Sequence, residues 1–241
     1  MLEIIGSHTL VPTGKEALWK IFRYRRGAEI FGEAEPADYI YQIKSGAVRT
    51  FKLLPDGRRQ ISSFHLPGDI FGIENGSTHR FTAEAILETK VLIAGRERVF
   101  GDDQEMCVFS NRELLKLIAD SLERAEIHVL LLGRQSAPER VAAFLLDMDQ
   151  RLRSPEILVL PILRRDIADY LGLTHETVTR CFSMLRDQRV LSYSGVSHRQ
   201  IVVHDRAKLA QLANGHGSKD DAKLWYSNKK SPGPLRSIKD R

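Results

Sequence analysis

The sequence predicts an α+β protein with an N-terminal β-roll, a long helix and a C-terminal winged helix-turn-helix. Three observations indicate this order: short β segments fill residues 20–95, a heptad pattern follows, and LRRDIADYLGLTHETVTRCFSML has the spacing of two short crossing helices. We expect the roll at 18–108, the long helix at 109–134, the winged helix-turn-helix at 135–209, and a basic, flexible tail at 210–241.

The N-terminal block alternates apolar segments with turn residues. The segments RRGAEIF, YIYQIKSGAVRTFKLL, RRQISSFHLPGDIFG and FTAEAILETKVLIAG are typical of strands. Between two of them, PDGR at 55–58 is a hairpin signal, because proline fixes one turn dihedral and glycine accepts a positive one. Glycines recur where strands of a compact antiparallel barrel would turn corners. The block predicts a small β-barrel or jelly-roll-like domain.

From Asn111 the apolar period becomes helical, and one narrow seam runs along about six turns. The seam residues, spaced alternately three and four apart, are Leu115, Ile118, Leu122, Ala125, Val129 and Leu132. A second stripe of Leu114, Leu117 and Leu131 is expected to rest on the barrel. A continuous heptad seam suits a partner helix and favours a homodimer. The alternative is a helix packed wholly inside one subunit.

The third block contains the helix-turn-helix. Ala168, Gly172 and Val178 supply the small residue at the helix contact, the glycine in the turn and the apolar residue under the second helix. Thr174 is expected to cap that helix with its hydroxyl. Before the motif, Pro138–Leu152 predicts a helix, whose inner face would hold Val141, Phe144, Leu145 and Met148. After it, VLSYSGVSHRQIVV predicts the two strands of a β-wing.

The start of the second helix is the part that meets base edges when such a helix enters the major groove. The candidate DNA-binding residues are therefore Thr174, His175, Glu176, Thr179 and Arg180. Arg180 can donate two hydrogen bonds to O6 and N7 of guanine, and Glu176 can accept one from the amino group of cytosine.

The charge and apolar content of the chain bear on its partners and its location. The net charge is +5, but residues 213–241 hold seven Lys or Arg against three Asp, so the basicity lies mostly in the tail. We interpret the tail as a solvated appendage; nonspecific attraction to phosphates is the alternative. There is no apolar run long enough for a membrane span and no secretion signal at the N-terminus, so we expect a cytoplasmic protein.

The chain offers few groups for catalysis or redox chemistry. Cys107 and Cys181 are too few for a disulfide framework or a four-cysteine metal site. Cys181 follows Arg180, so its oxidation would disturb DNA contact, although its helical phase favours a buried structural thiol. A cupin-like metal enzyme is the rival of another class, but its site needs several histidines and the roll offers only His65 on its strand. We expect no catalytic residues and no metal.

In this order the blocks resemble the Crp/Fnr family of transcription regulators. YIYQIKSGAVRTFKLLPDGRRQI and HLPGDIFG resemble the family's sensor roll, and RRDIADYLGLTHETVTR resembles the recognition segment of its Fnr and FixK branches. The resemblance, nearest to FixK, implies a homodimer that reads TTGAT-type half-sites in a palindrome and contacts RNA polymerase. It also implies control of genes for microaerobic respiration, nitrogen fixation or denitrification. Glu176, Thr179 and Arg180 take the places of the branch's Glu, Ser and Arg.

The signal-sensing groups of relatives are missing. A Crp-type pocket uses an FGE segment, a short helix and an Arg-Ser or Arg-Thr pair, whereas this chain has FGIENGSTHRFTAEA. Glu74 is displaced by one residue, and phenylalanine follows Arg80. An Fnr-type iron-sulfur cluster needs four cysteines, and the N-terminal segment has none. We therefore expect no cofactor and a pocket filled by side chains; the alternative is a Crp-type regulator that responds to a cyclic nucleotide.

Overall fold

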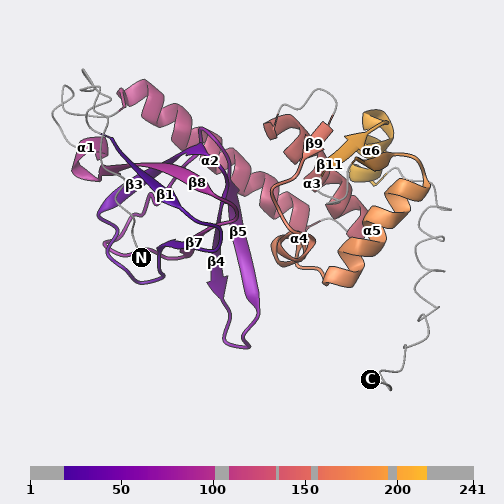
Figure 1. The fold of residues 1–241 in the computed structure, drawn as a ribbon, viewed down its shortest axis with the longest axis horizontal. Coiled ribbons are helices and arrows are strands. Elements are labelled where there is room, and N and C mark those ends of the chain that lie inside the picture. The colour runs from indigo at the N-terminus through magenta and orange to yellow at the C-terminus, as the bar shows by residue number, and fades with distance from the viewer. Residues whose placement is uncertain (1–18, 101–108, 134–135, 153–156, 195–199, 216–241) are drawn as a thin grey trace. The chain divides into compact units, whose positions relative to one another are not determined.

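The computed structural model describes residues 19–100, 109–133, 136–152, 157–194 and 200–215 (Figure 1). These residues form two compact units. The first comprises the described residues of Met1–Gly133 and of Leu160–Leu173, and the second those of Arg134–Val159 and of Thr174–Arg241. The chain thus passes from the first unit to the second and back before it enters the second unit again at Thr174.

The first unit contains the predicted β-roll, built from two antiparallel four-stranded sheets. One sheet has the order β1-β8-β3-β6 and the other β2-β7-β4-β5. The strands are β1 (Lys20–Tyr24), β2 (Glu29–Phe31), β3 (Tyr39–Ser45), β4 (Val48–Leu53), β5 (Arg59–His65), β6 (Ile70–Phe71), β7 (Thr82–Ala85) and β8 (Thr89–Gly95). The PDGR segment forms the β4–β5 turn as predicted, where the Leu54 amide donates to the Arg58 carbonyl at 2.8 Å.

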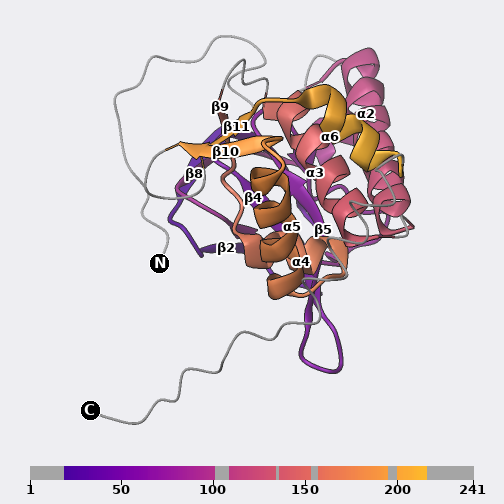
Figure 2. The same ribbon diagram turned by 90° about the vertical axis from the view of Figure 1, so that its right-hand side faces the viewer.

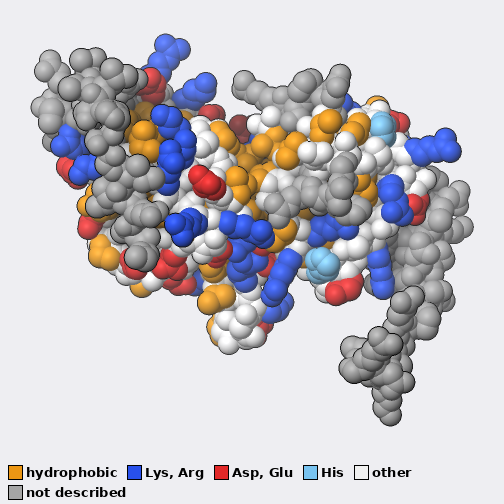
Figure 3. Space-filling view, viewed as in Figure 1, with side chains coloured by type: hydrophobic (Ala, Val, Ile, Leu, Met, Phe, Trp, Pro, Cys, Tyr) orange, Lys and Arg blue, Asp and Glu red, His pale blue; other side chains and the backbone are white. Residues whose placement is uncertain are grey.

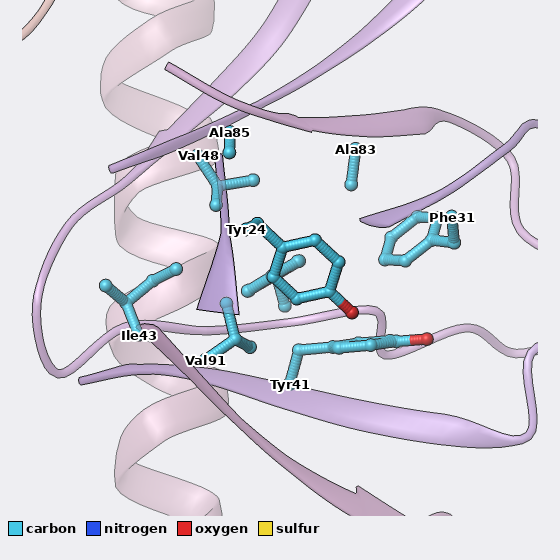
Figure 4. Packing of buried hydrophobic residues seen from close by; sticks show 9 residues of the cluster. Tyr24, Phe31, Tyr41, Ile43, Val48, Ala83, Ala85 and Val91 are labelled. Carbon is cyan, nitrogen blue, oxygen red and sulfur yellow. The ribbon is translucent and has the colours of Figure 1, made fainter. Parts of the chain in front are cut away.

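Aromatic and aliphatic side chains of both sheets fill the roll. Figure 4 shows Tyr24, Phe31 and Tyr41 converging from three strands, with smaller side chains around them. The Phe31 and Tyr41 rings lie 5.0 Å apart, and the Tyr41 and Phe71 rings 5.1 Å. Burial raises the pKa of the Tyr41 phenol. Each large side chain buried here contributes about 1.5–3 kcal/mol, so this cluster holds the two sheets together.

The long helix α2 (Asn111–Leu132) follows α1 (Glu97–Phe100). A capping box starts α2, because the Ser110 side chain accepts from the Glu113 amide and the Glu113 carboxylate accepts from the Ser110 amide. The predicted second stripe does pack inward: Leu114 lies against the cluster of Ile40, Ala94 and Val99, and Leu131 is buried. Within the described ranges, no helix combines the length and apolarity needed to cross a bilayer.

The second unit contains three helices and one small sheet among its described residues. The helices are α3 (Ala137–Leu152), α5 (His175–Asp187) and α6 (Arg206–Ala213), and the sheet has the order β10-β11-β9 from β9 (Ile157–Val159), β10 (Leu191–Ser194) and β11 (Gln200–Val203). Helix α3 buries the four predicted inner residues, and β10 and β11 are the predicted wing strands. Strand β9, which pairs with β11, was not predicted.

Helix α4 (Arg164–Leu171), the predicted first helix of the motif, lies with the first unit. At the other end, α6 continues past Leu209, the predicted end of the winged helix-turn-helix, and Leu212 and Ala213 are buried. The block boundaries drawn from the sequence stay predictions. Cys107, the tip of the wing at 195–199 and the tail from 216 onward lie outside the described residues.

Two turn glycines of the roll give a matched test of packing. Gly46 has φ +97°, and a Cβ there would meet Thr89 Oγ1 and lie 2.6 Å from Thr89 Cα and 2.7 Å from the Glu88 carbonyl oxygen. Gly57 has φ +81°, with open space around it. Gly46→Ala should therefore lose about 1–3 kcal/mol more in the free energy of unfolding than Gly57→Ala, as measured by urea denaturation. Equal losses would show that backbone strain alone sets the cost.

Candidate nucleic-acid interface

The turn at Gly172 and Thr174 fixes where the candidate recognition helix α5 begins. Gly172 ends α4 in the left-handed conformation, with φ +63° and its amide bonded to the Ala168 carbonyl. Thr174 then takes an extended conformation, and its hydroxyl accepts from the Thr177 amide at 3.2 Å. The predicted cap is therefore confirmed. The residue at which α5 begins decides which of its side chains are exposed and which are buried.

Helix α5 has one exposed and one buried face. Thr174, His175, Glu176 and Arg180 are exposed, and Thr179 is half-buried. Val178, Cys181, Phe182 and Leu185 are buried. The candidate DNA-binding residues thus lie on or beside the accessible face of the first two turns of α5. Cys181 lies among the buried side chains, as its helical phase predicted.

The Glu176 carboxylate is held in its charged form. Two hydrogen bonds keep the pKa of Glu176 below its ordinary value. The larger effect comes from its own backbone amide at the open start of the helix, and the smaller from the Thr174 hydroxyl. The charges of His175 and Arg180 act in the same direction. Glu176 is therefore a hydrogen-bond acceptor at neutral pH, and Arg180, four residues later, is the donor beside it.

The hydroxyl of Thr179 is covered and has no hydrogen-bond partner within the described part of the chain. A buried hydroxyl without a partner costs about 1–3 kcal/mol. A helical threonine usually avoids this cost by bonding a carbonyl of the preceding turn. The sequence could not show this, because the side-chain rotamer is set by the neighbours of α5.

In the roll, the segment between β6 and β7 lacks the short helix of a Crp-type cassette, as predicted. Its two charged groups bond each other: Arg80 Nε lies 2.6 Å from Glu74 Oε2, and the Arg80 amide donates to Glu74 Oε1 at 3.2 Å. The Glu74 side chain is 6% exposed and that of Arg80 71%. The Arg80 side chain is therefore largely exposed and is already paired with Glu74.

In the same segment, the His79 side chain points into the interior of the roll. Its ring stacks on Phe31 with centroids 3.6 Å apart, and burial lowers the pKa of His79, which favours the neutral ring. The imidazole is buried, and neither ring nitrogen has a hydrogen-bond partner in the described residues. Together with the aromatic cluster of Figure 4, these contacts agree with the expectation that side chains fill this part of the roll.

The predicted seam of α2 is exposed along its length. Leu115 and Val129 are 68% and 69% exposed, and Leu122 is 59% exposed. Ile118, Ala125 and Leu132 are exposed as well. The seam is thus an apolar stripe that the described subunit leaves uncovered.

Lys and Arg side chains occur at several places on the visible face, mixed with acidic ones (Figure 3).

The sequence analysis did not predict the ion pairs between α4 and the roll. Asp166 and Asp169 of α4 bond Arg49 and Arg59 of the roll. More than a hundred positions separate these partners, and no local pattern signals such a pairing.

Comparison with known proteins finds two family domains in the chain. Residues 21–101 match the cyclic nucleotide-binding domain, and residues 139–212 match the Crp-like helix-turn-helix domain. The nitrogen fixation regulation protein FixK of Rhizobium meliloti (strain 1021) is 48% identical over 169 residues, 70% of this chain and 76% of that protein. A solved structure, FixK2 from Bradyrhizobium japonicum, aligns with a TM-score of 0.73 and 51% identity, covering 80% of this chain and 96% of that one.

A cyclic-nucleotide-type roll, a long helix and a helix-turn-helix domain define a class of transcription regulators, and this chain belongs to it as a member of the Crp/Fnr family. Within the family it is similar to the FixK branch. FixK of Azorhizobium caulinodans is another such relative, 42% identical over 197 residues, 78% of this chain and 77% of that protein. The family assignment sets aside the cupin-like enzyme considered from the sequence.

The covered hydroxyl of Thr179 generates a stability prediction. Thr179→Val keeps the side-chain shape and removes the unpaired hydroxyl, so it should raise the free energy of unfolding by about 1 kcal/mol. Thr179→Ser keeps the hydroxyl and should bring no gain. Urea denaturation of both variants compares them. A Val variant no more stable than the Ser variant would mean that the hydroxyl finds a partner in solution.

Proposed function

We propose that this protein is a cytoplasmic, sequence-specific DNA-binding transcription regulator that acts as a homodimer on a palindrome of TTGAT-type half-sites. In this proposal it works with RNA polymerase as an activator and performs no catalysis. It controls genes for nitrogen fixation, microaerobic respiration or denitrification, and the relatives named for nitrogen fixation regulation support the first of these.

One observation carries the proposal: Glu176 and Arg180 are exposed one turn apart on the first two turns of a capped helix within a Crp-like helix-turn-helix domain. A guanidinium and a charged carboxylate at this spacing can bond guanine on one strand and cytosine on the other. Thr174 and His175 lie beside them, where phosphate contacts fix the register of such a helix. Thr179 offers a methyl group for a thymine methyl.

The exposed seam of α2 supports the dimer. An uncovered stripe of leucine, isoleucine and valine leaves apolar area in water, and each such side chain contributes about 1.5–3 kcal/mol when it is fully buried. A second copy of α2 would cover the stripe with the same residues, as a two-fold interface requires. Two copies also match the two half-sites of a palindrome.

The Glu74–Arg80 ion pair supports DNA binding without a cyclic nucleotide, because a phosphate would have to displace a carboxylate already bonded to Arg80. In the same proposal neither iron nor exclusion of air is needed, and Cys181 acts as a structural thiol, since it is buried. The Crp-type alternative would instead show DNA binding only after addition of a cyclic nucleotide.

The seam generates the prediction on assembly. Ile118→Glu combined with Leu122→Glu places like charges in the dimer interface, so the variant should sediment as a monomer and bind a palindromic duplex at least about 10-fold more weakly. Lys116→Glu, an exposed change beside the seam, is the matched control and should remain dimeric. A double variant that stays dimeric and binds like the wild type would place the interface elsewhere.

Base readout is tested with Arg180→Ala. Loss of a bidentate guanine contact should cost about 1–3 kcal/mol on the specific palindrome and flatten discrimination at that base pair. Affinity for a scrambled duplex should change little. Gel shifts in air without added nucleotide or iron, at several salt concentrations, measure both.

Two controls separate readout from general attraction to DNA. Arg186→Ala removes an exposed arginine from the last turn of α5, and deletion of 216–241 removes the basic tail without touching α6. Any loss in these controls should fall on specific and scrambled DNA alike and fade at high salt. If Arg180→Ala lowered both affinities equally, Arg180 would contact phosphate and the assigned readout would be withdrawn.

A further inference from the structure

The segment between β6 and β7, residues 74–80, is bonded through its backbone to the connection between β2 and β3. The Ala34 amide donates to the His79 carbonyl at 2.8 Å, and the His79 amide donates to the Glu35 carbonyl at 2.9 Å. Hydrogen bonds on both sides of one residue leave its backbone little freedom to move. The main chain of His79 is thus held in place by the roll itself.

The His79 ring lies against aromatic rings from two strands. Phe31 belongs to β2, at the edge of its sheet (Figure 2), and its ring plane is 12° from parallel to that of His79. The Tyr41 centroid of β3 is 6.2 Å away, and burial raises the pKa of that phenol, so it stays neutral. The His79 side chain is 0% exposed. It therefore packs like an apolar ring, although a neutral imidazole keeps one nitrogen that can bind a proton.

The charged groups around His79 offer a proton little compensation. Glu74 is the nearest carboxylate, with Oε1 3.9 Å from His79 Nδ1. Both of its oxygens already accept from Arg80, Oε1 from the amide and Oε2 from Nε. Glu35 and Asp38, on the connection between β2 and β3, attract a charge on the ring more weakly than Glu74 does. A charged ring would thus have to share a carboxylate that is already bonded.

Burial outweighs these attractions. The loss of water lowers the pKa of His79 more than the three carboxylates raise it, so the folded protein keeps the ring neutral. In the unfolded chain the same ring is exposed to water and has its ordinary pKa of about 6.5. As the pH falls below about 6.5, the unfolded chain therefore binds a proton that the folded chain does not bind, and stability is lost. Well above this pH both states are neutral at His79, and the loss disappears.

We propose that His79 is a proton-binding switch of the roll: a proton on this buried ring opposes its packing against Phe31, so mild acid destabilises the roll. The switch needs no ligand other than the proton. It lies in the part of the chain that matches the cyclic nucleotide-binding domain, and it does not depend on the proposed DNA binding.

Unfolding of the roll can be followed through the fluorescence of Trp19, which packs against buried side chains of β3 and β8. The other tryptophan of the sequence is Trp225, so the full chain with Trp225→Phe gives a signal from Trp19 alone. Urea denaturation at about pH 7.5 and about pH 5.5 then measures how the equilibrium constant for unfolding changes with acid.

Three variants in this background isolate His79. His79→Phe keeps a flat ring on Phe31 but binds no proton, and His79→Gln removes both the ring and the titration. On acidification the unfolding constant should rise about 3- to 10-fold more with His79 present than in either variant. His204→Gln removes an exposed histidine of the second unit and serves as the matched control, which should keep the full acid response. The remaining histidines are the same in all these proteins, so their contribution cancels.

A second measurement needs no substitution. The ring-proton resonance of His79, assigned by its through-space contacts with Phe31, should titrate in the folded protein with a midpoint below about 6.5. A midpoint at or above that value would overturn the proposal. So would His79 variants that keep the full acid response of the unfolding constant. If neither variant folds, the midpoint of the His79 titration decides.

Discussion

The rest of the candidate interface depends on the capped turn between Gly172 and Thr174. Gly172 ends one helix in a conformation that other residues rarely adopt, and the Thr174 hydroxyl starts the next by bonding an amide that would otherwise lack a partner. A shift of one residue at this turn would rotate α5 by about 100°. Val178 and Cys181 would then leave the core, and Glu176 and Arg180 would leave the exposed face.

The two faces of helix α2 have different surroundings. One face places Leu114 against the roll, buries Leu131 and stacks His128 on Tyr170 of α4. The other carries the exposed seam.

The interior of the roll is filled largely by its own side chains. Phe31, Tyr41 and Phe71 pack in its interior, His79 stacks on Phe31, and Glu74 bonds Arg80. Apolar burial and the paired charge stabilise the roll. The same scaffold is thus available to support α2 and α4.

Local patterns in the sequence determined most of the elements and the candidate reading residues. The heptad period of α2, the cap at Thr174, the PDGR turn and the helical phase of Cys181 depend on neighbours within a few residues, and backbone geometry makes them readable. Only the tertiary structure decided the pairing of β9 with β11, the covered hydroxyl of Thr179 and the bonds of Arg49 and Arg59 to α4. Charged side chains more than a hundred residues apart carry no mutual signal along the chain. Their partners are fixed when the strands and helices pack, because burial then leaves each carboxylate only the donors that face it.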